Sequence, residues 1–170
     1  LFCIVGAVGL SSSETWKRKM AYMRYDLSHI RENRNPDNQL SDARRLLTDS
    51  MGLSILRDHL WAGAGIGDVR NEVEMLYEKH FPQYTKKTRG HIHNQYLLML
   101  AGCGLIGGCL FFGAMLFPVL YHFRNGEILM GTVTLALFLV LWWEPFLMYQ
   151  HGNTIYLLVL VAGLQKHRKT

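Results

Sequence analysis

Polar and apolar residues are segregated along this 170-residue chain. Residues 11–92 are dense in Lys, Arg, Asp and Glu, whereas the remainder consists of long uncharged runs. The run 96–121 contains no charged residue, and as a helix its 26 positions would extend about 39 Å, enough to cross a bilayer with tilt. Two further apolar runs follow it. The pattern predicts a large polar loop followed by membrane helices.

The fold class we predict is all-α, with polytopic membrane helices and a large, partly helical loop. The apolar opening, 1–10, is too short to cross a bilayer and lacks the basic start of a signal peptide, so we expect it to end a helix that begins outside this sequence. The predicted segments are the end of a transmembrane helix (1–10), a loop domain (11–92), a transmembrane helix (93–122), a turn (123–127), a transmembrane helix (128–148), a turn (149–153), a short transmembrane helix (154–165) and a tail (166–170).

Basic residues in the short connections predict the orientation. Arg124 lies in the turn 123–127, and three of the last five residues are Lys or Arg. Two spans separate this turn from the tail, so both lie on one side, which the positive-inside bias makes cytoplasmic. The loop 11–92 would then face the opposite compartment. The run 154–164 is short for a span, and a half-inserted segment remains an alternative.

The loop should contain two helices. Ser41 and Asp42 form an N-terminal cap signal for a first helix reaching Trp61, and the glycines from Gly63 end it. Asp68 is expected to cap a second helix that Pro82 ends. The apolar residues of the first helix form two stripes, one of Leu46, Leu53, Leu56 and Leu60, and a second of Leu47, Met51 and Ile55 that widens the apolar face.

Composition excludes several kinds of function. Fourteen Lys and Arg against eleven Asp and Glu give the loop a net charge of only +3, without the basic stripe of a nucleic-acid binder, so no nucleic-acid partner is expected. The three cysteines lie in apolar stretches without metal-ligand or redox spacing. The turn Gly63-x-Gly65-x-Gly67 lacks the strand and spacing of a nucleotide-binding loop. A tight turn near the membrane surface is the favoured interpretation.

The most informative motif lies where the loop re-enters the membrane. It begins with His91-Ile92-His93-Asn94 and continues, after the nine intervening residues 95–103, with Gly104-x-x-Gly107. Taken alone, Gly104 and Gly108 at four-residue spacing are ordinary helix-packing positions in membranes. A histidine at an interface is also unremarkable.

The complete pattern resembles the O-antigen ligase family, which includes O-antigen polymerases and O-oligosaccharyltransferases. Its members typically show His-Asn, nine residues and Gly-x-x-Gly where the large periplasmic loop enters the next helix. Upstream they show an arginine, a helix and a Pro-x-x-Gly-x-Gly-like turn. Here Arg45 precedes such a helix, and 57–68 looks like that turn, with Leu60 where proline is frequent. The resemblance covers most of 41–122.

This resemblance implies a multi-pass protein of the bacterial inner membrane that moves a glycan from a polyprenyl-pyrophosphate carrier to a hydroxyl of a lipid or glycan acceptor. A cation must meet the departing pyrophosphate, and we expect Arg45 in this role, with Arg44 as the substitute. A neutral histidine, His93, would take the acceptor proton. His91 either assists or lies at the interface, and Asn94 orients the helix entry or contacts sugar.

We expect a metal-independent glycosyltransferase without a cofactor, because no acidic cluster resembles a magnesium site. Asp42, Asp49 and Asp58 are interpreted as surface or capping residues. Glu144 stays open between a functional carboxylate at membrane depth and a side chain that reaches water. Two alternatives remain: a polymerase of the same superfamily, which these motifs do not separate from a ligase, and a non-catalytic membrane transporter or binding protein.

Overall fold

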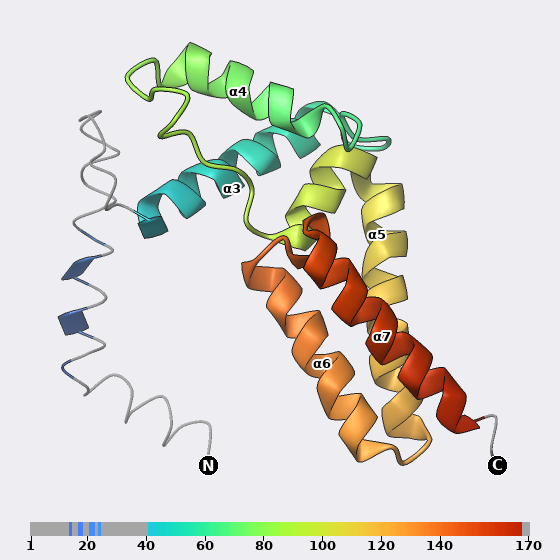
Figure 1. Ribbon diagram of the computed structural model, residues 1–170. Helices are drawn as coiled ribbons and strands as arrows, with labels where there is room; N and C mark the ends of the chain where they lie inside the picture. The colour runs from blue at the N-terminus through green and yellow to red at the C-terminus, as the bar shows by residue number, and fades with distance from the viewer. Residues whose placement is uncertain (1–13, 15–16, 19–20, 23, 25–40, 168–170) are drawn as a thin grey trace.

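The computed structural model describes residues 41–167, together with positions 14, 17, 18, 21, 22 and 24. The expected helix end at 1–10, most of 11–40 and the last residues of the tail lie outside the described residues. The described part is all-helical, as predicted (Figure 1). Its elements are α3 (Ser41–Asp58), α4 (Val69–His80), α5 (Gln95–Arg124), α6 (Ile128–Trp143), the short 3₁₀ helix η1 (Phe146–Met148) and α7 (Gln150–His167).

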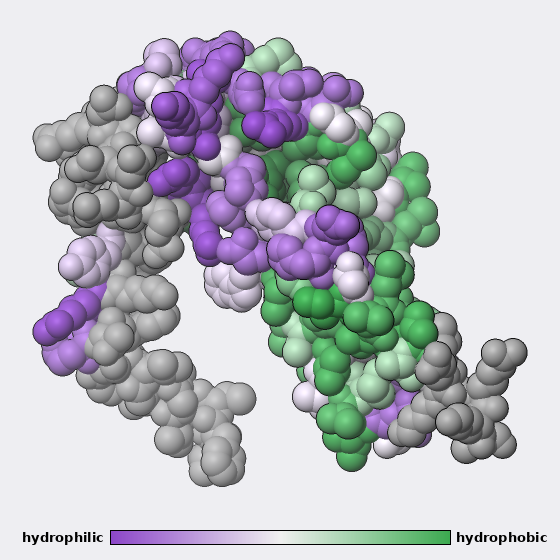
Figure 2. All heavy atoms as spheres, viewed as in Figure 1, coloured by the Kyte–Doolittle hydropathy of each residue, from purple (hydrophilic) through white to green (hydrophobic). Residues whose placement is uncertain are grey.

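The helices form two regions of different character. In Figure 1, α3 and α4 lie together at one end, and α6, α7 and most of α5 descend from them side by side. Figure 2 shows hydrophilic residues over the α3–α4 end and hydrophobic residues over the descending helices. The polar loop and the apolar runs of the sequence are therefore separate parts of the structure. We call them the loop region and the bundle.

One of the two predicted stripes forms the core of the loop region. The second stripe of α3 is buried, with Leu47, Met51 and Ile55 only 2–6% exposed, and it packs with Val69, Val73 and Tyr77 of α4. The first stripe is not part of this core, although Leu56 is half-buried. Leu46, Leu53 and Leu60 are 41–58% exposed, because α3 turns its second stripe toward both α4 and α5.

α5 is not a continuous rod. Gly104 has φ +68° and ψ −171°, far from helical values, and the helix reverses there (Figure 1). The ring of Tyr96 lies 5.9 Å from that of Phe111 and 5.3 Å from that of Phe112, although residues 15 or 16 positions apart on a straight helix are separated by roughly 23–24 Å. α5 therefore consists of a first arm, 95–103, and an antiparallel second arm, 105–124. The expected unbroken 39 Å helix does not form.

The turn after α3 fills the break in α5. Gly63 has φ +74°, and a side chain there would collide with the backbone of Gly102, while one at Gly104 would collide with that of Trp61. Backbone hydrogen bonds connect the two segments: Ala64 N–H to Ala101 O (2.9 Å), Gly65 N–H to Gly102 O (2.9 Å) and Leu105 N–H to Leu60 O (2.8 Å). The glycine turn predicted at 63–67 thus docks into the helix break rather than forming a nucleotide site.

The bundle also departs from the predicted boundaries. α6 ends at Trp143, and residues 150–153, expected in a turn, form the start of α7. The connection lies at 144–149 instead, because Pro145 has no N–H to continue a helix. The other end is held by His122 and Glu127, whose Nδ1 and Oε2 atoms are 2.7 Å apart and almost fully buried.

Among the described residues, α5 is the one helix long and apolar enough to cross a membrane, and α6 is apolar but shorter. Because α5 reverses at Gly104, the part of suitable length is its second arm. That arm has about 20 residues and is roughly 30 Å long, close to the thickness of a hydrocarbon core. The polytopic arrangement stays a prediction.

Candidate functional site

His93 lies at the junction between the loop region and the bundle. It precedes the first arm of α5. Asn94 caps this arm, because its side-chain oxygen accepts a hydrogen bond from the N–H of Leu97 at 3.1 Å. Of the two interpretations of Asn94, helix entry is the one that this bond matches. The neighbours Ile92 and Gln95 are 2% exposed, and the Gln95 side chain accepts from the N–H of Leu147 at 3.2 Å. These contacts fix the His93 backbone against the 144–149 connection.

Two chemically active side chains, Arg45 and Glu144, lie beside His93. Arg45, from α3, donates through Nη2 to Oε1 of Glu144 at 2.7 Å. The other carboxylate oxygen, Oε2, is 3.6 Å from Nδ1 of His93. The carboxylate of Glu144 therefore bridges the guanidinium and the imidazole, which are 48 residues apart in sequence. Arg45 and Glu144 are 39% and 42% exposed, so a ligand can reach both.

Asp49 lies on the same site, one helical turn after Arg45. Burial raises the pKa of Asp49 above its usual value, although the backbone N–H groups of His93 and Asn94, and the charges of His93 and Arg45, act in the opposite direction. Asp49 Oδ1 and His93 Nδ1 are both buried without a hydrogen-bond partner among the described residues. Asp49 is thus half-buried beside the backbone that leads into α5, whereas Asp58 is exposed.

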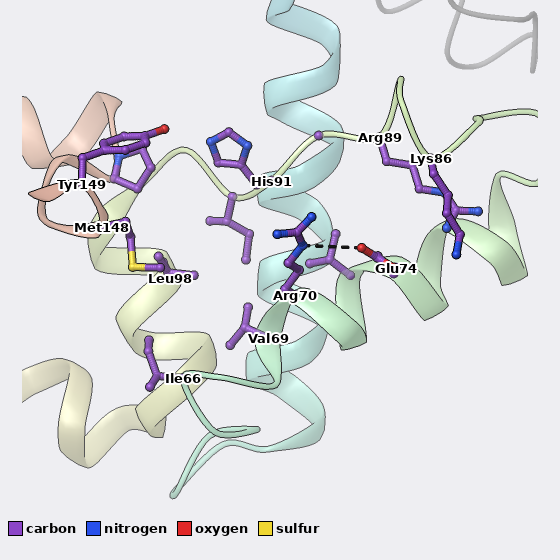
Figure 3. A pocket seen from close by; sticks show the side chains of 14 residues that line it. Ile66, Val69, Arg70, Glu74, Lys86, Arg89, His91, Leu98, Met148 and Tyr149 are labelled. Carbon is purple, nitrogen blue, oxygen red and sulfur yellow. Dashed lines mark ion pairs between the residues drawn. The ribbon is translucent and has the colours of Figure 1, made fainter.

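The two remaining candidates lie on different sides of this group. Arg44 packs its Cγ and Cδ atoms against Gly90, near Tyr77 and Tyr84, so its side chain leaves α3 away from Glu144. The His91 ring lies against that of His93, with centroids 4.4 Å apart and the planes tilted by 37°. Its ring faces a cavity beneath α4, where Figure 3 labels it. The structure brings Arg45, His93 and His91 together but leaves Arg44 outside the group.

From the sequence, the role of Glu144 is open, and Asp49 is expected to be a surface or capping residue. Both carried a signal. Glu144 is a lone carboxylate in an apolar run, followed by a proline that ends the helix. Asp49 follows Arg45 by four residues, a spacing that places two side chains on one face of a helix. Neither signal identifies a partner, because the partners come from segments far apart in the chain.

A comparison with protein families identifies the family of the chain. The family model for O-antigen ligases matches residues 1–112, about two thirds of the chain and including Arg45 and His93. The chain belongs to the O-antigen ligase family. Proteins of this family are membrane-bound. Searches of curated proteins and of solved structures gave no significant match.

The pKa of His91 predicts a pH dependence of stability in this family member. Desolvation by burial, then the neighbouring His93, lowers the pKa of His91 below 6.5, with Arg70 and Arg45 acting in the same direction and Glu144 against them. The unfolded chain therefore binds the proton more readily, and stability should fall as the pH drops below about 6.5 toward the folded-state pKa. In His91→Gln, melting temperatures in detergent between pH 8 and pH 5 should decline less than in the parent. An equal decline in both proteins would contradict this role of His91.

Proposed function

We propose that this protein transfers a glycan from a polyprenyl-pyrophosphate carrier to a hydroxyl of a lipid or glycan acceptor. The observation that carries the proposal is the group formed by Arg45, Glu144 and His93. It combines a permanent cation, a base of the right type and a carboxylate between them, at the boundary between a polar region and an apolar bundle.

The reaction needs a base and an anion partner at the same time. The acceptor oxygen forms a bond to the anomeric carbon, the bond from that carbon to the carrier phosphate breaks, and its electrons leave with the pyrophosphate. The acceptor proton moves to His93. Glu144 Oε2 lies 3.6 Å from Nδ1, just beyond hydrogen-bond distance, and in the proposed reaction it closes on Nδ1, which would keep the proton there and leave Nε2 as the base. Arg45 meets the charge on the pyrophosphate, as the family resemblance implies.

The membrane arrangement belongs to the same proposal. The loop region would lie on the periplasmic face of the bacterial inner membrane, and the turn containing Arg124 would lie on the cytoplasmic side. In this orientation, His93 and Arg45 lie at the level where a membrane-anchored pyrophosphate meets water. Membrane lipids are then partners of the bundle surface. No metal or cofactor enters the proposed reaction.

The direct test supplies the full-length protein, in detergent or nanodiscs, with a lipid-pyrophosphate-linked oligosaccharide and candidate acceptors. Mass spectrometry of the products separates the possibilities. Transfer to lipid A-core or to protein indicates a ligase, and lengthened carrier-linked chains indicate a polymerase. Failure to transfer with every acceptor, together with passage of unaltered substrate across a vesicle membrane, would favour the transporter alternative instead.

Glu144 should act as a positioning residue for His93. In Glu144→Gln the imidazole loses the carboxylate that favours its tautomer and stabilises its protonated form, so we expect a rate loss of about 10²-fold, within the range that a positioned base contributes. The acid limb of the pH–rate profile should also move. Glu127→Gln is the matched control, since it alters a second His–Glu pair at the far end of the bundle. An unchanged pH profile in Glu144→Gln would show that the carboxylate acts on stability alone.

A further inference from the structure

A cavity of about 440 Å³ lies beneath α4, beside the group formed by Arg45, Glu144 and His93. Its volume is within the range of about 300–1,000 Å³ that is usual for ligand pockets. Figure 3 shows it between α4, the strand-like segment that carries His91, and the connection with Met148 and Tyr149. The apolar part of its wall consists of Ile66, Val69, Val73, Ile92, Leu98 and Met148.

The two ends of the cavity differ in chemistry. At one end are Tyr149 and Pro145, the residue after Glu144. The Tyr149 ring stacks on His151, with centroids 5.4 Å apart and planes at 10°. This ring offers a flat, half-exposed surface on which the apolar face of a sugar can pack. At the other end, Figure 3 shows Lys86 and Arg89 close together.

The cationic end has more positive than negative charge. Its wall contains three cations, Arg70, Lys86 and Arg89, and one carboxylate, Glu74. Arg70 contacts Glu74 at 3.5 Å but is 86% exposed, which leaves its guanidinium accessible. Arg89 is held in place by Glu78 and by the Tyr77 ring, with its side chain 11% exposed. This end therefore suits an anionic group, and its wall includes the Arg89 side chain in a fixed position.

His91 connects the cavity to the reactive group. It lines the wall, and its ring lies against that of His93. Arg45, by contrast, is not among the residues lining the cavity. A ligand in the cavity would therefore approach His93 from the side away from the guanidinium that we assign to the carrier pyrophosphate.

We propose that this cavity binds the acceptor glycan and selects acceptors that carry an anionic group, a phosphate or a carboxylate, near the attacking hydroxyl. The inference rests on the proposed function, because only that function makes the bound glycan an acceptor. The Tyr149 end supports a sugar ring, the Arg70–Lys86 end binds the anion, and the hydroxyl reaches His93 past His91.

The test compares an anionic acceptor with a neutral one of the same sugar sequence. In Arg70→Gln and Lys86→Gln, the KM for the anionic acceptor should rise about tenfold, while kcat at saturation and the KM for the donor change less than twofold. The KM for the neutral acceptor should not change. Lys79→Gln, an exposed cation of α4 that does not line the cavity, is the matched control. Equal losses with both acceptors, or a raised donor KM, would overturn the proposal.

A binding measurement keeps this inference separate from the proposed reaction. A fluorescent anionic oligosaccharide is titrated into the full-length protein without donor, in nanodiscs of neutral lipid. Weaker binding in Arg70→Gln and Lys86→Gln supports the cavity even if no transfer is ever seen, and unaltered binding rejects it. Phosphorylated and uronic acid probes separate the two anions. Displacement of the probe by added anionic phospholipid would assign the site to a lipid headgroup instead, and would reject the glycan.

Discussion

Replacing His93 with alanine in the full-length protein is expected to lower the transfer rate by about 10²–10⁴-fold, the contribution of a positioned general base. Without the imidazole, the acceptor hydroxyl must lose its proton to water while it attacks the anomeric carbon. Binding of the donor should be largely preserved, because the carrier pyrophosphate is assigned to Arg45. The loss should therefore appear in kcat, with only a small change in the KM for the donor.

His80→Ala is the matched control, since His80 is exposed at the end of α4 and lies outside the site. Both variants should be purified in similar yield, with equal melting temperatures in detergent, before rates are compared. The transfer rate is followed as product appearance by gel or mass spectrometry. A His93→Ala protein that is folded and transfers at the parental rate would reject the enzyme proposal. The family membership would remain, and a binding or transport role would have to replace catalysis.

The contact between Arg45 and Glu144 bears on how the proposed reaction would begin. A guanidinium bound to a carboxylate is a resting arrangement, and an incoming pyrophosphate, with more negative charge, can compete for it. Both side chains are more than a third exposed, so this exchange needs no large conformational change. When Arg45 turns to phosphate, Glu144 keeps its second contact, with His93, and is then free to support the protonated imidazole. Donor binding would in this way prepare the base.

Much of the loop region could be predicted from the sequence. The bounds expected for the helix from Asp68 to Pro82 match α4, and Ser41 begins α3, because glycines and prolines act locally. The Asp68 side chain, expected to cap α4, makes no capping hydrogen bond. The buried side of α3 was harder. Two apolar stripes compete on this helix, and which one is buried depends on the positions of α4 and the first arm of α5. Local pattern has no information about those positions.

The reversal of α5 could not be read from hydrophobicity. Both arms are apolar, so the run 96–121 has the same pattern whether it is one long helix or two antiparallel arms. Gly104 was interpreted as a packing position, since spacing alone does not reveal a positive φ. The reason for the reversal lies 40 residues upstream, in the turn that donates hydrogen bonds to the broken helix.

The candidate site was predicted in part. His93 and Arg45 followed from the family resemblance, and the structure brings them to one carboxylate. Glu144 and Asp49 complete the group, but their significance depends on distances between α3, the start of α5 and the end of α6. Arg44 illustrates the converse. It is adjacent to Arg45 in sequence, yet on a helix neighbouring side chains point in different directions, about 100° apart.

The second large effect should come from Gly104. In Gly104→Ala, a side chain must adopt φ +68° with ψ −171°, a region that is essentially restricted to glycine, and must also overlap the backbone of Trp61. Strain of roughly 1–3 kcal/mol and overpacking of a similar size should lower the free energy of unfolding by about 2–6 kcal/mol. The turn would be forced out of the helix break, and both His93 and Arg45 would lose their relative positions. We expect a lower melting temperature in detergent, and transfer activity lost together with it.

Alanine variants at two other glycines separate backbone strain from overlap with neighbouring atoms. Gly126 also has positive φ, +72°, but a side chain there meets nothing within 4 Å, so Gly126→Ala measures backbone strain alone, about 1 kcal/mol or slightly more. Gly113 lies in the second arm without positive φ and also has open space around it, so Gly113→Ala should be neutral or stabilising. The expected order of melting temperatures is Gly113→Ala highest, then Gly126→Ala, then Gly104→Ala. If Gly104→Ala instead melts with Gly126→Ala and retains transfer, contact between the turn and the helix break is not what holds the arginine and histidine together.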